Sequence, residues 1–154
     1  MLIPLRSVVL SRLSITRSFA STITQIHKPS LLSLLKAPQQ PANPTAVIDV
    51  RNSLEIALSG RLDDKVINIP LQLFTTPSFL EIFGDTEEKR SLEYQEFKEE
   101  HLVPHPLSEE GMETTYIFSC KAGVRSMMAA EVILASGGGK EIMNYPGGSN
   151  DWFS

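Results

Sequence analysis

Residues 116–126 read YIFSCKAGVRS, and their order of apolar and polar residues indicates the type of fold. An apolar, strand-like run ends at Cys120, a short loop containing Gly123 follows, and a helix-like run begins at residues 127–130. A strand that passes through a tight loop into a helix is typical of α/β proteins. The loop places Cys120 at a helix N-terminus, where backbone N–H groups and the helix dipole favour negative charge. We therefore expect the Cys120 thiol to ionise readily and to attack as a thiolate.

Apolar runs and helical segments alternate along the rest of the chain. Strands are expected at residues 46–50, 66–69, 114–119 and 141–145. Helices are expected at 30–36 with Ser30 as N-cap, from Asn52 or Ser53 to Leu58, at 71–74, at 78–83, from Glu87 to about His101 after Thr86, and from the cysteine loop to about Ser136. In the charged helix, Leu92, Tyr94 and Phe97 would mark the inward face. This alternation predicts an α/β fold with a central, mostly parallel sheet and helices on both faces.

The N-terminal segment differs in composition from the rest. Residues 1–24 contain no acidic residue and are rich in arginine, serine and threonine, which resembles a mitochondrial transit peptide. Residues 17–21 resemble a matrix-protease cleavage context, with cutting near Phe19 or Ala20. A secretory signal is the alternative, but Arg12 and Arg17 interrupt its apolar stretch. We expect a transit peptide at 1–24, a folded domain at 25–154 and a location in the mitochondrial matrix.

Charge and cysteine content exclude several classes of protein. From residue 41 onward, 9 basic and 18 acidic residues give a net charge of −9, which does not support nucleic-acid binding. No run approaches the ~20 apolar residues of a membrane-spanning helix. A single cysteine excludes an internal disulfide and argues against a cysteine-based zinc or iron–sulfur site. His27, His101 and His105 lack metal-ligand spacing, so no metal and no cofactor are expected.

The loop after Cys120 is suited to binding an anion. Successive N–H groups of such a loop converge into an anion-binding nest, and Gly123 permits the backbone conformations that this requires. Lys121 adds positive charge. Arg125 can offer two parallel donors to an oxyanion, or can brace the loop by binding a carboxylate such as that of Asp49. The candidate loop residues are Lys121, Ala122, Gly123, Val124, Arg125 and Ser126.

Two further charged residues end the first strand of the predicted sheet. Asp49 and Arg51 lie where open α/β sheets place their sites. We expect a structural role for both, with Asp49 capping a turn and Arg51 forming a surface ion pair. Trp152 is expected to seal the core near the C-terminus, and Met127 and Met128 to lie in the core or in a pocket wall.

Four segments, in order, resemble the single-domain rhodaneses, which are thiosulfate sulfurtransferase-type proteins. They are Ile48–Arg51, Ile67–Pro70, Cys120–Ser126 and Asn144–Gly148, the last followed by Asp151 and Trp152. The resemblance covers about residues 30–154. The chain departs from the family at Gly60–Val66, where rhodanese-like proteins have small residues and a Pro-Gly pair. This departure affects the shape of a loop and, through it, the access of substrate.

The resemblance implies an enzyme with a persulfide mechanism. Cys120 would take the sulfane sulfur of thiosulfate or glutathione persulfide and pass it to glutathione, sulfite or cyanide. One alternative is a sulfur carrier or regulatory module that delivers sulfur to a partner protein. Another is a relative of the cysteine phosphatases and arsenate reductases, whose cysteine-to-arginine loop is one residue longer than that between Cys120 and Arg125. The oligomeric state and the physiological donor are left open.

Overall fold

The computed structural model describes residues 22–80 and 86–154. The transit peptide predicted at 1–24 therefore lies almost wholly outside the described residues, as does the second half of the helix predicted at 78–83. The elements in chain order are β1 (Ile23–Gln25), α2 (Lys28–Lys36), β2 (Thr45–Asp49), α3 (Ser53–Ser59), β3 (Ile67–Asn68), α4 (Leu71–Thr75), α5 (Pro77–Leu80), α6 (Glu87–His101), α7 (Glu109–Met112), β4 (Thr115–Ser119), α8 (Val124–Ser136), β5 (Glu141–Asn144) and α9 (Gly148–Trp152).

In the described part of the chain the strands form a five-stranded sheet of order β1-β5-β4-β2-β3. Every neighbouring pair is parallel, which confirms the predicted α/β class. Strand β4 lies at the centre, with Phe118 aligned to Ile48 of β2 on one side and to Asn144 of β5 on the other. The carboxyl ends of β2 and β4 therefore lie side by side, and the chain leaves the sheet there at Val50 and Cys120.

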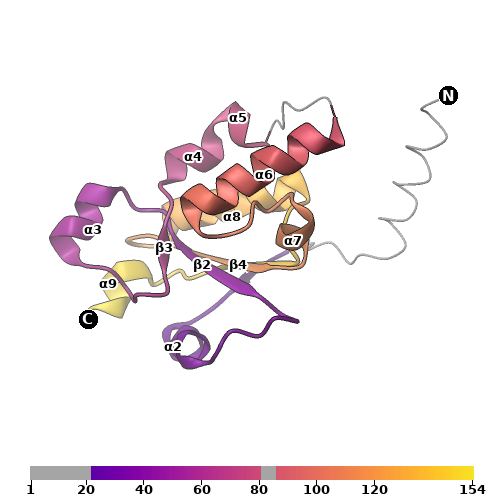
Figure 1. Cartoon of the computed structure of the whole chain (residues 1–154). Helices are drawn as coiled ribbons and strands as arrows, with labels where there is room; N and C mark the ends of the chain where they lie inside the picture. Colours follow the sequence, from indigo (N-terminus) through magenta and orange to yellow (C-terminus); the bar gives the residue numbers. More distant parts are fainter. Residues whose placement is uncertain (1–21, 81–85) are drawn as a thin grey trace.

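Helices cover both faces of this sheet, and the side chains of β4 alternate between two cores. Figure 1 shows α2 on one face and α4, α6 and α8 on the other. Tyr116 and Phe118 belong to the larger core, together with side chains of α4 and α8, whereas Ile117 points into the smaller core with Leu31 and Leu35 of α2. A strand buried on both faces reads as a continuous apolar run, which is why residues 114–119 were predictable.

Local capping rules explain several helix ends. Thr86 caps α6 by accepting a hydrogen bond from the Lys89 backbone N–H at 3.2 Å, as predicted. Gly137 ends α8 in the left-handed conformation, with φ of 77°, which a glycine adopts without strain. Asn52 caps α3, again as predicted.

Other expectations were wrong. Helix α2 begins at Lys28, with His27 as N-cap and a proline in its first turn, so Ser30 lies inside the helix. Strand β3 has only two residues. Strand β1 was not predicted, and it includes residues 23 and 24, which sequence analysis placed ahead of the domain. Leu92 is 56% exposed and so does not face inward.

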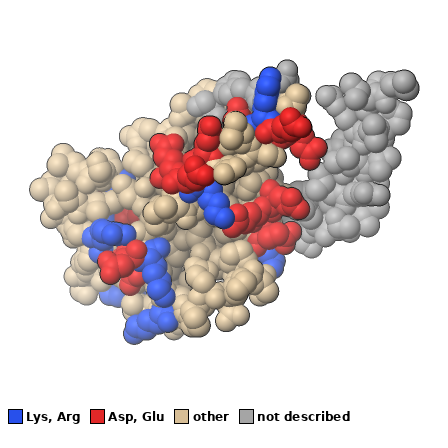
Figure 2. Space-filling model, in the orientation of Figure 1, with Lys and Arg blue, Asp and Glu red and all other residues tan. Residues whose placement is uncertain are grey.

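Acidic side chains gather over two helices of the described chain. Figure 2 shows acidic side chains gathered over α6 and α7, with a few cations among them. Lys98 of α6 and Glu110 of α7 form an exposed ion pair with 2.7 Å between Nζ and Oε2. Within residues 22–80 and 86–154, no helix has the length and apolarity to cross a bilayer. The same ranges contain no group of three His, Cys, Asp or Glu side chains placed to hold a metal ion.

Candidate active site

Cys120 lies one residue beyond β4, at the carboxyl end of the central strand. It follows the alternation of Tyr116 and Phe118, so its side chain points towards the α8 face of the sheet. Gly123 is the N-cap of α8, with φ of 87°. A Cβ on Gly123 would lie 2.5 Å from the backbone oxygen of Pro146, so both conformation and space require glycine here. The turn from strand to helix is thus as tight as the sequence predicts.

The sulfur of Cys120 is surrounded by hydrogen-bond donors. The Gly123 backbone N–H donates to Sγ at 3.1 Å, and the Ser126 hydroxyl lies 3.3 Å from Sγ. Burial alone would raise the pKa of the thiol, but the Ser126 hydroxyl and the backbone amides of Ser126, Ala122 and Gly123 outweigh that effect and lower the pKa below its usual value. The site therefore favours the thiolate, which is the nucleophilic form of cysteine.

The thiol is nevertheless buried. Cys120 is only 1% exposed, although it lies at the start of a surface loop. Its neighbours Lys121, Ala122 and Val124 are exposed and form the rim above it. The polar environment of the buried sulfur comes from the loop amides and the Ser126 hydroxyl.

Helix α9 fixes the loop from behind. The backbone N–H of Ser149 donates to the Cys120 carbonyl at 2.8 Å, and that of Asn150 donates to the Lys121 carbonyl at 3.1 Å. Gly148 has φ of 59°, and a Cβ there would lie 2.5 Å from both of these carbonyl oxygens. The glycine at the end of residues 145–148 therefore allows the start of α9 to approach the backbone of the cysteine loop closely.

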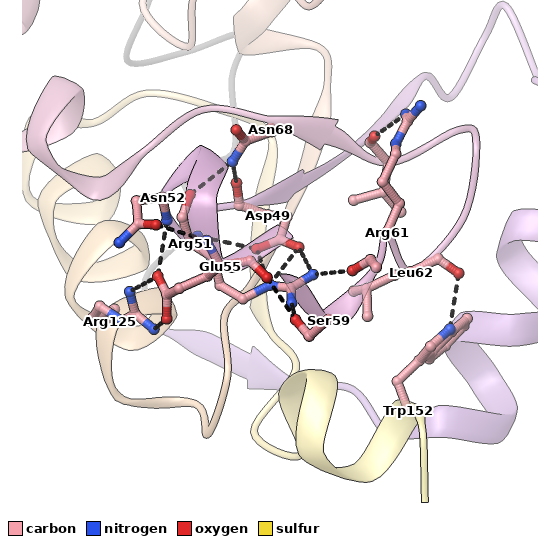
Figure 3. A network of polar contacts seen from close by, with 12 residues as sticks. Asp49, Arg51, Asn52, Glu55, Ser59, Arg61, Leu62, Asn68, Arg125 and Trp152 are labelled. Atoms are coloured by element: carbon pink, nitrogen blue, oxygen red, sulfur yellow. Dashed lines mark hydrogen bonds and ion pairs between the residues drawn. The ribbon is translucent and has the colours of Figure 1, made fainter. Parts of the chain in front are cut away.

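Arg125 is paired with a carboxylate that sequence analysis did not single out. Its Nη1 and Nη2 each donate to one oxygen of Glu55, both at 2.7 Å (Figure 3). Glu55 also accepts a bond from the Asn52 backbone N–H at 3.0 Å and completes a capping box at the start of α3. The bond to Arg125 and the other contacts hold the pKa of Glu55 at about 2. Arg125 thus braces α3 against α8, through Glu55 and not through Asp49.

Asp49 and Arg51 pair with each other instead of reaching the loop. Arg51 Nη2 donates to Asp49 Oδ2 at 2.7 Å, and the two residues are 1% and 2% exposed. The guanidinium also donates to Ser59 Oγ at 2.8 Å and to the Gly60 carbonyl at 2.9 Å, while Asn68 binds the backbone of both residues from β3 (Figure 3). The expected surface ion pair of Arg51 is therefore wrong, because its charge is buried. The structural role expected for the two residues agrees with these contacts.

The segment that departs from the rhodanese pattern is held by its own contacts. Within Gly60–Val66, Arg61 donates to the Val66 carbonyl at 3.0 Å. Trp152 Nε1 donates to the Leu62 carbonyl at 2.8 Å, and Trp152 packs against the smaller core, as predicted. Met128, by contrast, is 46% exposed on α8, so of the two expected places, the core or a pocket wall, the core is wrong.

A depression of about 460 Å³ lies between α3 and α9 and reaches Lys121 of the cysteine loop. It is lined by Arg51, Glu55, Leu58, Ser59, Lys121, Ser149, Asn150, Phe153 and Ser154. Leu58 and Phe153 are 81% and 50% exposed, so they give part of its rim an apolar character. The depression combines Lys121, which follows the nucleophile in the chain, with apolar surface and with Glu55, the carboxylate that binds Arg125.

Comparisons with known proteins agree with this architecture. The Rhodanese family model, described as a rhodanese-like domain, matches residues 31–154. A mouse (Mus musculus) protein, thiosulfate sulfurtransferase/rhodanese-like domain-containing protein 3, is 30% identical over 137 residues, which are 89% of this chain and 73% of that protein.

Two solved structures have the same fold. The human single-domain sulfurtransferase TSTD1 superposes with a TM-score of 0.59 at 22% identity, over 86% of this chain and 96% of that one. The single-domain sulfurtransferase RDL2 of Saccharomyces cerevisiae gives a TM-score of 0.59 at 22% identity, over 86% of this chain and 90% of that one. At this identity the two structures establish a shared fold.

Proposed function

Since the chain belongs to the rhodanese-like domain family, we propose that it is a sulfurtransferase with Cys120 as its nucleophile. The donor is thiosulfate or glutathione persulfide, and the acceptor is glutathione, sulfite or cyanide. The observation that supports this most directly is the cradle of donors around Sγ, formed by the Gly123 amide at 3.1 Å and the Ser126 hydroxyl at 3.3 Å. A thiolate stabilised in this way is ready for covalent catalysis.

The reaction has two displacement steps that balance without a redox cofactor. In the first, the Cys120 thiolate attacks the outer sulfur of thiosulfate, the S–S bond breaks, and sulfite leaves with the electron pair. Cys120 then holds one additional sulfur as a persulfide anion. In the second, the acceptor attacks that outer sulfur, and the Cys120 thiolate leaves. The same donors that favour the thiolate would stabilise negative charge on sulfur in both steps.

The loop residues divide these tasks. The amides of Ala122 and Gly123 and the hydroxyl of Ser126 act on the sulfur itself. Lys121 is exposed at the rim, where its charge would attract an anionic donor. Arg125 forms an ion pair with Glu55, and through this pair it holds α8, the helix that follows the cysteine loop, against α3. Val124 is 69% exposed and forms an apolar part of the rim.

Mass spectrometry of the protein after exposure to thiosulfate tests this proposal. We expect one added sulfur atom at Cys120 and its removal by glutathione, with neither change in Cys120→Ser. Turnover of a phosphate ester is the matching test for a cysteine-phosphatase activity, and hydrolysis of the ester without uptake of sulfur would contradict a sulfurtransferase.

A sulfur carrier is a second candidate, favoured by the burial of Cys120 together with exposed apolar side chains nearby. Leu58 and Phe153 line the depression beside the loop and would suit contact with a partner protein. A carrier would retain its persulfide in the presence of small thiols and transfer it to a protein acceptor. Rates of persulfide loss to glutathione separate the two roles.

The N-terminal segment is proposed to direct the protein into mitochondria. Strand β1 begins at Ile23 and pairs with β5, so cleavage near Phe19 or Ala20 would leave the sheet complete. A fluorescent protein fused to residues 1–21 should enter mitochondria, and the chain that begins at residue 22 should remain outside them. Mitochondrial entry of the shortened chain would contradict this proposal.

A further inference from the structure

The carboxylate of Glu55 binds the guanidinium of Arg125, which follows the cysteine loop in the chain. Both terminal nitrogens of Arg125 donate to it at 2.7 Å, so this pair of parallel donors is occupied and does not bind another oxyanion at the same time. The two side chains are 29% and 34% exposed, and the pair is therefore accessible from solvent. Asn52 holds the carboxylate from the other side through its backbone N–H. Glu55 is thus a fixed internal anion at a place where an anionic substrate would bind.

The charges around the depression give this anion its importance. Arg51 is neutralised by Asp49, and Arg125 is neutralised by Glu55. Of the two cations among the described residues that line the depression, Arg51 is paired with Asp49, whereas Lys121 forms no ion pair with a described carboxylate. The pKa of Arg125 is raised, first by its bond to Glu55 and to a smaller extent by the charge of Cys120, so the guanidinium lies within electrostatic reach of the sulfur. Glu55 therefore decides whether the site presents one available positive charge or two.

We propose that Glu55 is a specificity-determining residue that weakens the binding of oxyanionic donors by competing with them for Arg125. The inference rests on the proposed sulfur transfer. The sulfonate end of thiosulfate presents its oxygens to a guanidinium as a carboxylate does, and the two cannot bind the same pair of nitrogens together. A neutral organic persulfide has no such need of Arg125. Glu55 thereby shifts the preference of the site towards organic persulfides.

The substitution Glu55→Gln isolates the charge. Glutamine has nearly the same volume and still accepts the capping-box bond from Asn52. The readout is protection of Cys120 from alkylation by iodoacetamide, with sulfate as an oxyanion that cannot transfer sulfur. We expect the half-protecting sulfate concentration to fall by about threefold to tenfold in Glu55→Gln. The KM for thiosulfate should fall by a similar factor, whereas the KM for a neutral organic persulfide should change by less than about twofold.

Two further variants make the test specific. Glu110→Gln removes a carboxylate from the Lys98–Glu110 pair, far from the loop, and should leave sulfate protection unchanged. In the double variant Glu55→Gln/Arg125→Gln, the gain should disappear, because the freed guanidinium is absent.

Equal protection in the natural chain and in Glu55→Gln would overturn the proposal, as would a gain that persists without Arg125. Sulfate protection does not depend on sulfur transfer. If the natural chain takes up no sulfur from thiosulfate, the sulfurtransferase assignment fails, and the protection measurement still decides the role of Glu55.

Discussion

Cys120 and His105 are both buried titratable residues, and their surroundings act on them in opposite ways. Burial opposes the charged form of each. For Cys120, the Ser126 hydroxyl and three backbone amides outweigh burial and lower the pKa of the thiol. His105 is 3% exposed and stacks on Phe79 with ring centroids 4.5 Å apart, and burial lowers the pKa of its imidazole to about 4. A reactive group is thus distinguished from a packed one by donors aimed at its charge, not by its depth.

The largest expected effect comes from removal of the Cys120 sulfur. Cys120→Ser keeps the size and approximate shape of the side chain but loses the polarisable nucleophile, so sulfur transfer should fall by at least about a thousandfold. The free energy of unfolding in urea should change by no more than about 1 kcal/mol, because the loop amides can bind the serine hydroxyl. Transfer at a rate near that of the natural chain would remove Cys120 from the mechanism.

The Asp49–Arg51 pair should behave in the opposite manner, with a large effect on stability and a small one on chemistry. Arg51→Met leaves the buried Asp49 carboxylate without its partner and should cost about 3–5 kcal/mol of unfolding free energy. Alkylation of Cys120 in the folded variant should change by less than about twofold. The double variant Asp49→Asn/Arg51→Met should regain part of the lost stability. An unchanged urea midpoint of unfolding in Arg51→Met would show that the buried Asp49–Arg51 pair does not stabilise the folded chain.

The sequence was sufficient wherever a feature depends on neighbouring residues. Apolar runs predicted β2, β4 and β5 to within one residue or two, and Thr86, Asn52 and Gly137 marked helix ends by local hydrogen bonding or conformation. The turn that presents Cys120 is likewise local. Each of these features depends on only a few consecutive residues, which is why the sequence predicts it.

Features that depend on distant residues were missed. Glu55 and Arg125 are 70 positions apart, and nothing near either residue shows that they meet. The N-x-x-E pattern at Asn52 could have indicated that Glu55 has a fixed orientation, but not its partner. Strand β1 has three residues and no pattern of its own, and it exists because β5 offers an edge to pair with. The burial of Arg51 and of Cys120 depends in the same way on the packing of whole elements.

The contrast between His105 and Cys120 predicts a dependence of stability on pH. The folded-state pKa of His105, about 4, lies below the ordinary value of 6.5, so the unfolded chain binds a proton first as the pH falls. Stability from this residue is complete above pH 6.5 and is lost as the pH decreases towards 4. The loss between pH 7 and pH 5 should be about 2 kcal/mol in urea unfolding. In His105→Gln this slope should be nearly absent, and an equal slope in that variant would assign it to other groups.

The smallest expected effect concerns a single donor to the sulfur. Ser126→Ala removes the hydroxyl that lies 3.3 Å from Sγ, so the pKa of Cys120 should rise, because one of the hydrogen bonds that favour the thiolate is lost. Because the thiolate is the reactive form, the midpoint of iodoacetamide alkylation should move to higher pH, and sulfur transfer below that midpoint should slow by about threefold to tenfold. Ser136→Ala is the matched control, since Ser136 lies on the same helix and its hydroxyl donates to the Ile133 carbonyl and accepts from the Gly138 backbone N–H at the other end of that helix. A midpoint that does not move in Ser126→Ala would mean that the backbone amides alone hold the thiolate, and the loop would then lower the thiol pKa without help from any side chain.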